Sequence, residues 1–530
     1  MNTLTGTGKL IRFMLRRDRV LLPVWVLVFA YVPAGLVPGI KELYPTQAAR
    51  EQIAHSIGAT PAFTALMGPV YDPSLGGLVA WRGSLVTLIL GIITGLTVIR
   101  HTRTDEEAGR RELIGSAVVG RHANLASTLI VTIAATAVGT GLLTAGLISQ
   151  NLDGADSLAL GLQYGATGVV FACVAAVCAQ LTRGAGSARA IMFVVLGASF
   201  LLRMGGNLNK DMKWMLWISP AGWAQELRPF ADNKWWVLWI VAAVCVVLVA
   251  LAFVLQSHRD IEAGVLPTRL GRPQASPMLS NSFGLAWRLQ RGAFIGWAIA
   301  FILIGYMLGS MGKGVQDMLR DNKMMTQIVA QMGGSHQLTS AFIASMIGLM
   351  GLAVTGYSLQ AAVKPRAEEN ATHAENLLAT GVSRLSWQLS HLVFAFIGPA
   401  VVLALGGLAM VASYAAVIDD PSGAFGDVMR GAAVQLPAVW VLTALAVLLY
   451  GVLPRVLSLV WVALVLCLVF GQLGSAFQLP QWALDISPFT HLPKVPGHDI
   501  TAQPLLWLGA IAIVATVVGL GAFRRRDITA

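Results

Sequence analysis

The chain has 530 residues, of which 56% are hydrophobic and only 12% are charged, and its formal net charge is +11. Soluble domains have about a quarter charged residues, so this composition excludes an ordinary soluble protein. Apolar runs of about 20 residues, the length of helix that crosses the hydrocarbon layer, recur along the chain. They predict an all-α polytopic membrane protein.

The predicted spans begin after nineteen mostly polar residues, which is typical of a retained anchor rather than a cleaved signal peptide. The four cysteines lie inside apolar runs, where packing is the expected role rather than metal binding. In chain order, we predict twelve spans at 20–39, 80–99, 124–148, 158–181, 187–204, 236–255, 292–310, 339–361, 387–414, 431–453, 456–475 and 505–523.

The charges between the spans predict the orientation. With both termini in the cytoplasm, the inner segments hold most of the 37 lysines and arginines but fewer than half of the 26 acidic residues. This distribution follows the positive-inside tendency. We therefore expect a multi-pass protein of the plasma membrane with both termini cytoplasmic, in contact with the lipid bilayer and with no nucleic-acid partner.

A charged segment occurs twice. Residues 103–121 return in weakened form at 366–384, and at an offset of 263 the residues Arg103, Glu106 and Arg121 fall on identical residues. Further matches follow in the same order along the chain: Trp25 with Trp297, Ser219-Pro220 with Ser487-Pro488, and Arg259-Asp260 with Arg526-Asp527. This order predicts two pseudo-symmetric six-helix halves of the same orientation.

These halves are expected at 1–255 and 292–530. The segment 256–291 between them has the composition of a cytosolic linker, and it is predicted to end in a short connecting helix at 285–291. Residues 10–17 are its counterpart in the first half. Both stretches mix apolar residues with arginine, as a helix lying along the inner membrane surface would, although simple positive-inside flanks remain an alternative.

The repeated charged segments are predicted to start helices. Thr104 and Glu107 have the spacing of a capping box, and Pro365 favours a first helical turn in the second copy. Such helices would expose Glu106, Glu112, Glu369 and Glu375 to the cytosol or to a partner. Because topology requires positive charge but no particular glutamate spacing, the recurrence favours two equivalent docking sites over a solvated loop.

The predicted outer segments before the sixth and twelfth spans are rich in tryptophan and proline. Short helices that dip into the outer leaflet are expected there, and an aromatic belt without a specific role is the alternative. Gln163 and Gln435 align at an offset of 272. A helix–helix hydrogen bond is the favoured role for them, with a ligand contact as the alternative.

Two kinds of residue are missing. No acidic residue falls in the middle of a predicted span, which argues against a proton- or sodium-driven carrier. The stretch Gly6-Thr-Gly-Lys9 lacks the spacing of a nucleotide-binding phosphate loop. If ATP drives this protein, another polypeptide must hydrolyse it.

The charged segment with residues 377–384, the linker stretch 259–267 and residues 284–291 together resemble the permease subunits of ABC-2-type exporters. More narrowly, the chain resembles the fused twelve-span permeases of the actinobacterial tetronasin and polyketide-antibiotic exporter group, and the likeness covers essentially the whole chain. It implies a type V exporter-like fold and a separate cytosolic ABC ATPase that binds as two copies. ATP and Mg would be bound by that ATPase, so this chain would bind no cofactor or metal directly and would not be an enzyme by itself.

The resemblance also implies roles for particular residues. The segments 103–121 and 366–384 would be coupling helices that dock the ATPase, and the second and fifth spans of each half would line the route. Coupling could differ between the two ends, because Gly109 is replaced by Thr372 and Arg110 by His373. The candidate docking residues are Arg103, Asp105, Glu106, Glu112, Arg121, Arg366, Glu368, Glu369, Glu375 and Arg384. The candidate lining residues are Thr94, Thr97, Phe193, Phe200, Tyr357, Trp461 and Phe470.

We therefore expect an ATP-driven exporter of hydrophobic or amphipathic small molecules, such as antibiotics and other drugs. Export of a lipid or cell-envelope precursor by the same fold is an alternative. An ion-coupled secondary transporter and a membrane scaffold that transports nothing are the rivals from other classes.

Overall fold

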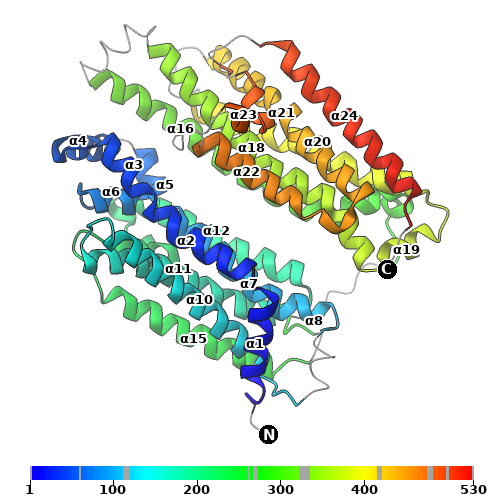
Figure 1. Cartoon of the computed structure of the whole chain (residues 1–530), viewed down its shortest axis with the longest axis horizontal. Coiled ribbons are helices and arrows are strands. Elements are labelled where there is room, and N and C mark those ends of the chain that lie inside the picture. Colours follow the sequence, from blue (N-terminus) through cyan, green and yellow to red (C-terminus); the bar gives the residue numbers. More distant parts are fainter. Residues whose placement is uncertain are drawn as a thin grey trace. The chain divides into compact units, whose positions relative to one another are not determined.

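The computed structural model describes residues 3–58, 61–110, 118–208, 210–260, 263–266, 273–321, 335–414, 421–473, 481–493, 495–496 and 500–527. Helices dominate these residues, and no strand occurs among them. The chain divides into two compact units, Met1–Gly271 and Arg272–Ala530. Figure 1 shows each unit as a bundle of long helices. The division falls within the predicted linker.

The N-terminal unit consists of six long helical segments with short helices at their ends. Its elements are α1 (Thr7–Arg17), α2 (Leu21–Ala34), α3 (Leu36–Leu43), α4 (Gln47–Gly58), α5 (Pro61–Met67), α6 (Leu75–Arg82), α7 (Val86–Ile99), η1 (Arg100–Thr104), α8 (Asp105–Glu107), α10 (Ala123–Ile148), α11 (Gly154–Leu181), α12 (Ala185–Leu208), η2 (Lys210–Met212), α13 (Trp214–Ile218), α14 (Pro220–Glu226) and α15 (Val237–Ser257).

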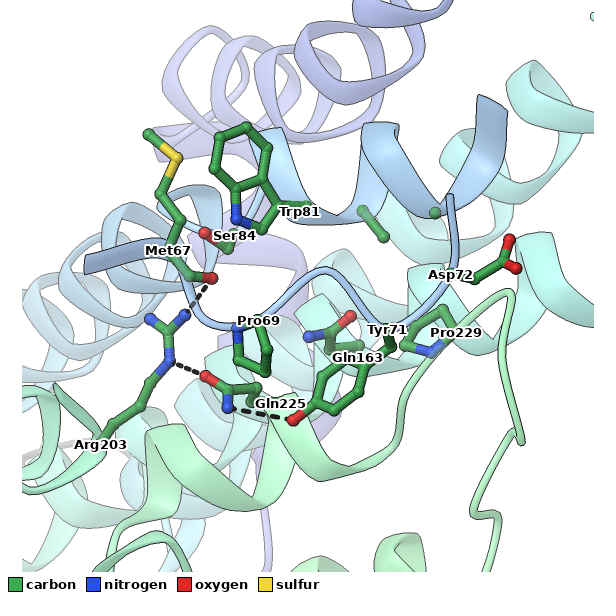
Figure 2. A pocket seen from close by; sticks show the side chains of 12 residues that line it. Met67, Pro69, Tyr71, Asp72, Trp81, Ser84, Gln163, Arg203, Gln225 and Pro229 are labelled. Carbon is green, nitrogen blue, oxygen red and sulfur yellow. Dashed lines mark hydrogen bonds between the residues drawn. The ribbon is translucent and has the colours of Figure 1, made fainter. Parts of the chain in front are cut away.

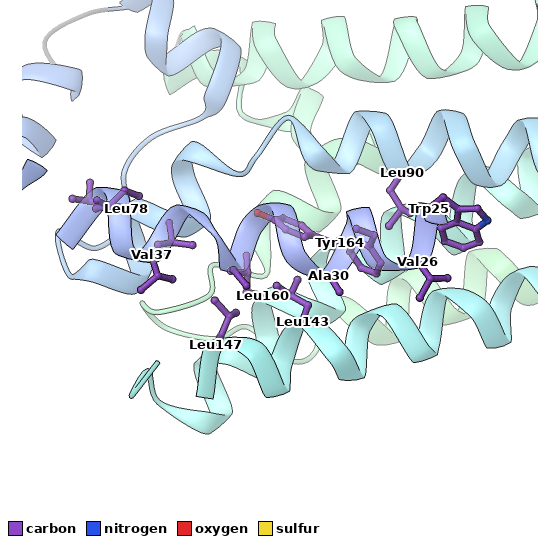
Figure 3. Packing of buried hydrophobic residues seen from close by; sticks show 14 of the residues in the cluster. Trp25, Val26, Ala30, Val37, Leu78, Leu90, Leu143, Leu147, Leu160 and Tyr164 are labelled. Atoms are coloured by element: carbon purple, nitrogen blue, oxygen red, sulfur yellow. The ribbon is translucent and has the colours of Figure 1, made fainter. Parts of the chain in front are cut away.

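Helix α11 is the centre of this unit and packs against α7, α10, α12 and α15. Its small residues let neighbouring backbones approach closely, as is usual for helices in membranes. At Gly168 an added Cβ would meet Leu90, and the Thr94 hydroxyl donates a hydrogen bond of 2.8 Å to the Gly168 carbonyl. Figure 3 shows part of the resulting core, where Leu90, Leu143 and Tyr164 pack together.

The C-terminal unit repeats this plan. Its elements are η3 (Pro277–Ser280), α16 (Ser282–Asp321), α18 (Ser335–Asn370), α19 (His373–Leu378), α20 (Arg384–Tyr414), α21 (Pro421–Val452), η4 (Pro454–Val456), α22 (Leu459–Leu473), α23 (Gln481–Leu484), η5 (Pro488–His491) and α24 (Ala502–Arg525). The extensive contacts of α16 with α20 and of α21 with α24 again involve glycines, at Gly305 with Gly406 and at Gly451 with Gly519.

Eleven helical segments among the described residues are long and apolar enough to cross a membrane, which confirms eleven of the twelve predicted spans. They are Leu21–Leu43, Val86–Glu107, Ala123–Ile148, Gly154–Leu181, Ala185–Leu208, Val237–Ser257, Ser282–Ser310, Ile343–Asn370, Arg384–Tyr414, Gly423–Val452 and Ala502–Arg525. The remaining prediction, 456–475, coincides with the apolar helix α22 and runs into residues outside the description.

Three predicted helix starts are wrong, because the spans before or after them continue through those positions. Helix α7 runs through η1 into α8, and Thr104 makes no capping bond. A helix that continues already supplies carbonyl acceptors for these N–H groups, so no cap is needed. Pro365 lies inside α18. The expected short helix 285–291 is part of α16, which begins at Ser282.

The long helices instead break at two equivalent positions. Gly109 has a φ of +69°, and Thr372, its partner at offset 263, has a φ of +60°. Both residues adopt the left-handed conformation that ends a helix. The short helices predicted in the tryptophan-rich segments are confirmed as α13 and α14 in the first unit and as α23 in the second.

Candidate functional site

A buried ion cluster joins the ends of three helical segments in the N-terminal unit. The Arg259 guanidinium donates to both oxygens of Glu106, at 2.7 and 2.8 Å, and Arg103 Nη1 lies 3.0 Å from the same carboxylate. Arg103 also donates to the carbonyls of Thr182 and Ala263. Charge-assisted bidentate pairs of this kind are strong and geometrically specific. We call Arg103, Glu106 and Arg259 the N-terminal clamp.

The C-terminal unit has the same cluster at the equivalent residues. Arg526 Nη2 donates to both oxygens of Glu369, at 2.8 and 3.0 Å, and Arg366 Nη1 lies 3.0 Å from Glu369. The Arg526 guanidinium also covers the Tyr450 ring, 5.0 Å from its centroid. We call Arg366, Glu369 and Arg526 the C-terminal clamp.

A third arginine, at the start of the third span, adds to each clamp. Arg121 donates to the Arg259 carbonyl at 3.0 Å, and Arg384 donates to the Arg526 carbonyl at 2.6 Å. Four pairs of positions matched in the sequence therefore make the same contacts in the two units. The duplication is preserved in interactions as well as in residue identities.

A second ion cluster in the N-terminal unit fixes the amphipathic helix α1. Asp18, directly after α1, is buried and accepts contacts from His101 at 2.5 Å and from Arg100 at 3.0 Å. Arg17 lies 2.5 Å from Asp105. Phe13 on α1 remains exposed. This arrangement agrees with a helix that lies against the end of the bundle with an apolar side left uncovered.

The predicted exposure of the docking glutamates is correct for one residue and wrong for two. Glu375 is exposed, whereas Glu106 and Glu369 are each only 2% exposed. The reason is that each of these two carboxylates pairs with two arginines of its own unit. Asp105 is also buried, and Glu112 lies outside the described residues.

The other docking candidates take part in local contacts. Glu368 pairs with Lys364 at 2.8 Å and with His373 at 3.1 Å. Sequence reasoning missed Arg259 and Arg526 as partners of the glutamates. Their match at offset 267 was the available signal, since a repeated arginine and a repeated glutamate imply a repeated contact.

The candidate lining residues fall into two groups. Thr94 and Tyr357 are buried within their own units, where Thr94 hydrogen-bonds the backbone and Tyr357 packs against Phe294 and Trp297. Phe193 and Trp461 have exposed rings, Thr97 and Phe200 are half-buried, and the Phe470 side chain lies outside the description. The lining role stays a prediction for all seven.

A polar cavity of about 30 Å³ lies at the other end of the second span from the N-terminal clamp. Figure 2 shows Arg203 reaching into its wall, where it donates to the Gln225 side chain at 2.6 Å and to the Met67 carbonyl at 2.8 Å. Gln163 and Ser84 also line the cavity. The Gln163 Oε1 atom is buried with no hydrogen-bond partner among the described residues, so the expected helix–helix bond is wrong for this atom.

All four cysteines are free thiols, and Cys173, Cys178 and Cys467 are buried, as their packing role predicted. Among the described residues, no cluster of histidine, cysteine or carboxylate side chains could hold a metal ion.

Two comparisons with known proteins point to the same family. The family model described as the C-terminal domain of the multidrug efflux system permease Rv1217c matches residues 11–255 and 279–524, two stretches of nearly equal length. The multidrug efflux system permease protein Rv1217c of Mycobacterium tuberculosis (strain ATCC 25618 / H37Rv) is 43% identical over 527 residues. That alignment covers 99% of this chain and 95% of the relative.

Proposed function

The chain belongs to the Rv1217c family of multidrug efflux permeases, and we propose that a separate ABC-type ATPase drives its export of hydrophobic or amphipathic compounds. The observation that carries the efflux function is the identity of 43% over nearly the full length of both proteins. The chain is a multi-pass membrane protein. The energy for export would come from a partner protein.

A partner ATPase is proposed because an efflux system needs energy and this sequence has no nucleotide-binding motif. Two copies would suit two units with equivalent ends, and ATP and Mg would bind to those copies. The resemblance to ABC-2-type exporters and to the tetronasin group supports the same assignment. The distribution of lysine and arginine supports cytoplasmic termini, and with that orientation both clamps would lie on the cytoplasmic side of the plasma membrane.

In this proposal, the segments 103–121 and 366–384 dock the ATPase. Each clamp joins the first residues of its docking segment to an arginine elsewhere in the same unit. Each clamp ties the end of the second span to an arginine within two residues of the end of the sixth span. A displacement of the docking segment would therefore move several spans together instead of bending one helix. Within the second segment, Glu375 is exposed, and Glu112 is its sequence counterpart in the first segment.

The route in this proposal is largely apolar, with the second and fifth spans of each half as its walls. Phe193 and Trp461 supply exposed aromatic rings on two of these helices. Such surfaces suit hydrophobic drugs. They would also suit lipids, so lipid or envelope-precursor export is one outcome of the test below.

The test uses the chain reconstituted in liposomes with its ATPase. Drug-stimulated ATP hydrolysis and ATP-dependent drug accumulation are the expected results. Glu375→Lys and Glu112→Lys should each lower the stimulated hydrolysis at least about tenfold, because each reverses a charge at the docking surface. Asp427→Lys is the matched control, since Asp427 is exposed but lies near the other end of the C-terminal bundle.

Each outcome separates the alternatives. Normal stimulated hydrolysis in both lysine variants would overturn the docking assignment. Transport that persists without ATP and stops when an ion gradient is removed would identify a secondary carrier instead. Stimulation by lipid alone, with no drug transported, would assign lipid export.

A further inference from the structure

We propose that the cavity around Arg203 binds the anionic group of an amphiphilic molecule, either a carboxylate or a phosphodiester. The site lies entirely within the N-terminal unit and needs no ATPase to be occupied. Its test is therefore independent of the function proposed above.

Arg203 is a buried cation with spare hydrogen-bonding capacity. It is 2% exposed, and its Nη1 atom has no hydrogen-bond partner among the described residues. Its other nitrogens bond to Gln225 and Met67, both of which are neutral acceptors. A guanidinium placed in a buried site without a counterion is costly, and an incoming anion would relieve that cost.

The carboxylates near the cavity are turned to other partners. Glu226 pairs with Arg228 at 2.6 Å and accepts the Tyr71 hydroxyl at 2.9 Å. Asp72 accepts the Ser74 backbone N–H at 3.0 Å. In Figure 2 its carboxylate lies at the opposite end of the cavity from Arg203 and points away. Among the described residues, no ion pair forms with Arg203, so the positive charge remains available.

The cavity offers further polar groups that suit an oxyanion. The Ser84 hydroxyl is buried and has no hydrogen-bond partner among the described residues. Gln163 lines the same cavity, and rotation of its amide can present either its oxygen or its NH₂ group. Arg203, Ser84 and Gln163 all line the cavity, and a guanidinium, a hydroxyl and an amide are the kinds of donor from which a carboxylate or phosphate oxygen accepts hydrogen bonds.

The apolar wall residues and the volume of the cavity indicate what the rest of the ligand is like. Met67, Pro69, Trp81 and Pro229 supply apolar surface beside the polar groups. The cavity of about 30 Å³ accommodates the oxygens of an anionic group but not a whole drug, for which pockets measure about 300 Å³ or more. The anionic group of the proposed ligand would fill the cavity, and its apolar part would extend beyond it. A molecule with these two parts is an amphiphile.

Arg203 has no basic counterpart in the aligned sequence of the second half. The sequence contains no lysine or arginine between Arg455 and Lys494, the stretch that aligns with Arg203 and its surroundings. One anionic group per chain is therefore expected, even though the clamps are duplicated.

The binding test uses the purified full-length chain and two probes. Radiolabelled laurate supplies a free carboxylate, and nanodiscs of phosphatidylglycerol or phosphatidylcholine supply an anionic or a zwitterionic lipid. Saturable laurate binding at one site is expected in detergent. Arg203→Gln should weaken it about tenfold or more, because a charge-assisted bond is lost. Arg203→Lys should weaken it less, and Arg430→Gln, a change at an exposed arginine of the other unit, should leave it unchanged.

The lipid arm identifies the source of the anion. Retention of phosphatidylglycerol but not phosphatidylcholine by native mass spectrometry, lost in Arg203→Gln, would assign a lipid headgroup. Laurate binding without lipid retention would assign a free carboxylate. Both support the proposal, whereas binding of neither probe, or equal binding to wild type and Arg203→Gln, overturns it.

A second variant keeps the test valid if Arg203→Gln does not fold. Ser84→Ala removes one donor but leaves the bonds from Arg203 to Gln225 and Met67 in place. It should weaken binding about threefold or more, and unchanged affinity in this variant would overturn the proposed site.

Discussion

Glu106 and Arg259, 153 residues apart in the chain, meet through two hydrogen bonds of 2.7 and 2.8 Å. Glu369 and Arg526, 157 residues apart, repeat this contact at 2.8 and 3.0 Å. In each unit one carboxylate thus holds two guanidinium groups. The clamps differ in burial, since the side chains of Arg103 and Arg259 are 1% and 4% exposed but those of Arg366 and Arg526 are 24% and 15% exposed.

Neutralising the two glutamates should therefore have unequal effects. Glu106→Gln leaves two deeply buried arginines without a counterion, so we expect it to lower the free energy of unfolding by about 3–5 kcal/mol. Glu369→Gln should cost about 1–2 kcal/mol, because water reaches its arginines. Denaturant unfolding in detergent measures both, with Glu375→Gln as the exposed control. Equal losses in the two variants would show that burial does not set the strength of the clamps.

The helix break after the second span of each half gives a second prediction. Thr372 has a φ of +60°, a conformation that costs a β-branched residue about 1–2 kcal/mol. Thr372→Gly should raise the free energy of unfolding by about 0.5–1 kcal/mol, after allowing for the greater freedom of glycine when unfolded. Thr372→Ala, which keeps a Cβ, should gain less.

The opposite change is expected at the matching position. Gly109 has a φ of +69°, and an added Cβ there meets no atom within 4 Å. Gly109→Ala should therefore lower the free energy of unfolding by about 1 kcal/mol through backbone strain alone. The melting temperatures of these three variants measure the effect. A stabilising Gly109→Ala would contradict the left-handed conformation.

A third prediction concerns two serines that align in the sequence. Ser219 is fully buried, caps α14 by accepting the Gly222 N–H at 3.0 Å, and donates to the Ser199 carbonyl at 2.6 Å. Ser219→Ala should therefore lower the free energy of unfolding by about 1–2 kcal/mol. Ser487 makes no capping bond, so Ser487→Ala should cost less. Thermal unfolding of the two variants and of the wild type measures these losses. Equal losses in the two variants would contradict the prediction.

The spans and the duplication were predictable because they depend on hydrophobicity and on matched residues. Eleven helices long enough to cross a membrane match predicted spans, and the aligned arginines and glutamates make equivalent contacts. The roles of those charges were harder to predict. A glutamate between arginines has the same sequence pattern whether it faces water or a buried partner, and the partners Arg259 and Arg526 lie more than 150 residues away.

The Arg203 cavity could not be predicted for a related reason. Arg203 lies near the end of a predicted span, where an arginine usually extends its charge to the membrane surface. The segments 67–84 and 225–229 fold over it and bury it, and that packing is long-range. The alternative of a ligand contact at Gln163 was visible in the sequence, but the presence of Arg203 in the wall of the same cavity was not.

The fourth prediction tests whether Thr94 and Tyr357 line a route or only pack. The Thr94 hydroxyl donates to the Gly168 carbonyl of the neighbouring helix at 2.8 Å. Thr94→Val should therefore lower the free energy of unfolding by about 0.5–1.5 kcal/mol. The Tyr357 hydroxyl is buried with no hydrogen-bond partner in the described part of the chain. Tyr357→Phe should thus be neutral or slightly stabilising, because it removes an unsatisfied group.

Drug transport by the same variants provides the second measurement. If both residues only pack, the relative transport rates of several drugs should not change in either variant, whatever happens to stability. If they line the route, removing either hydroxyl should change these relative rates, since a polar contact to the substrate is lost. A change of drug preference in Tyr357→Phe, with its stability intact, would be strong evidence for a lining role, because no loss of folded protein could explain it.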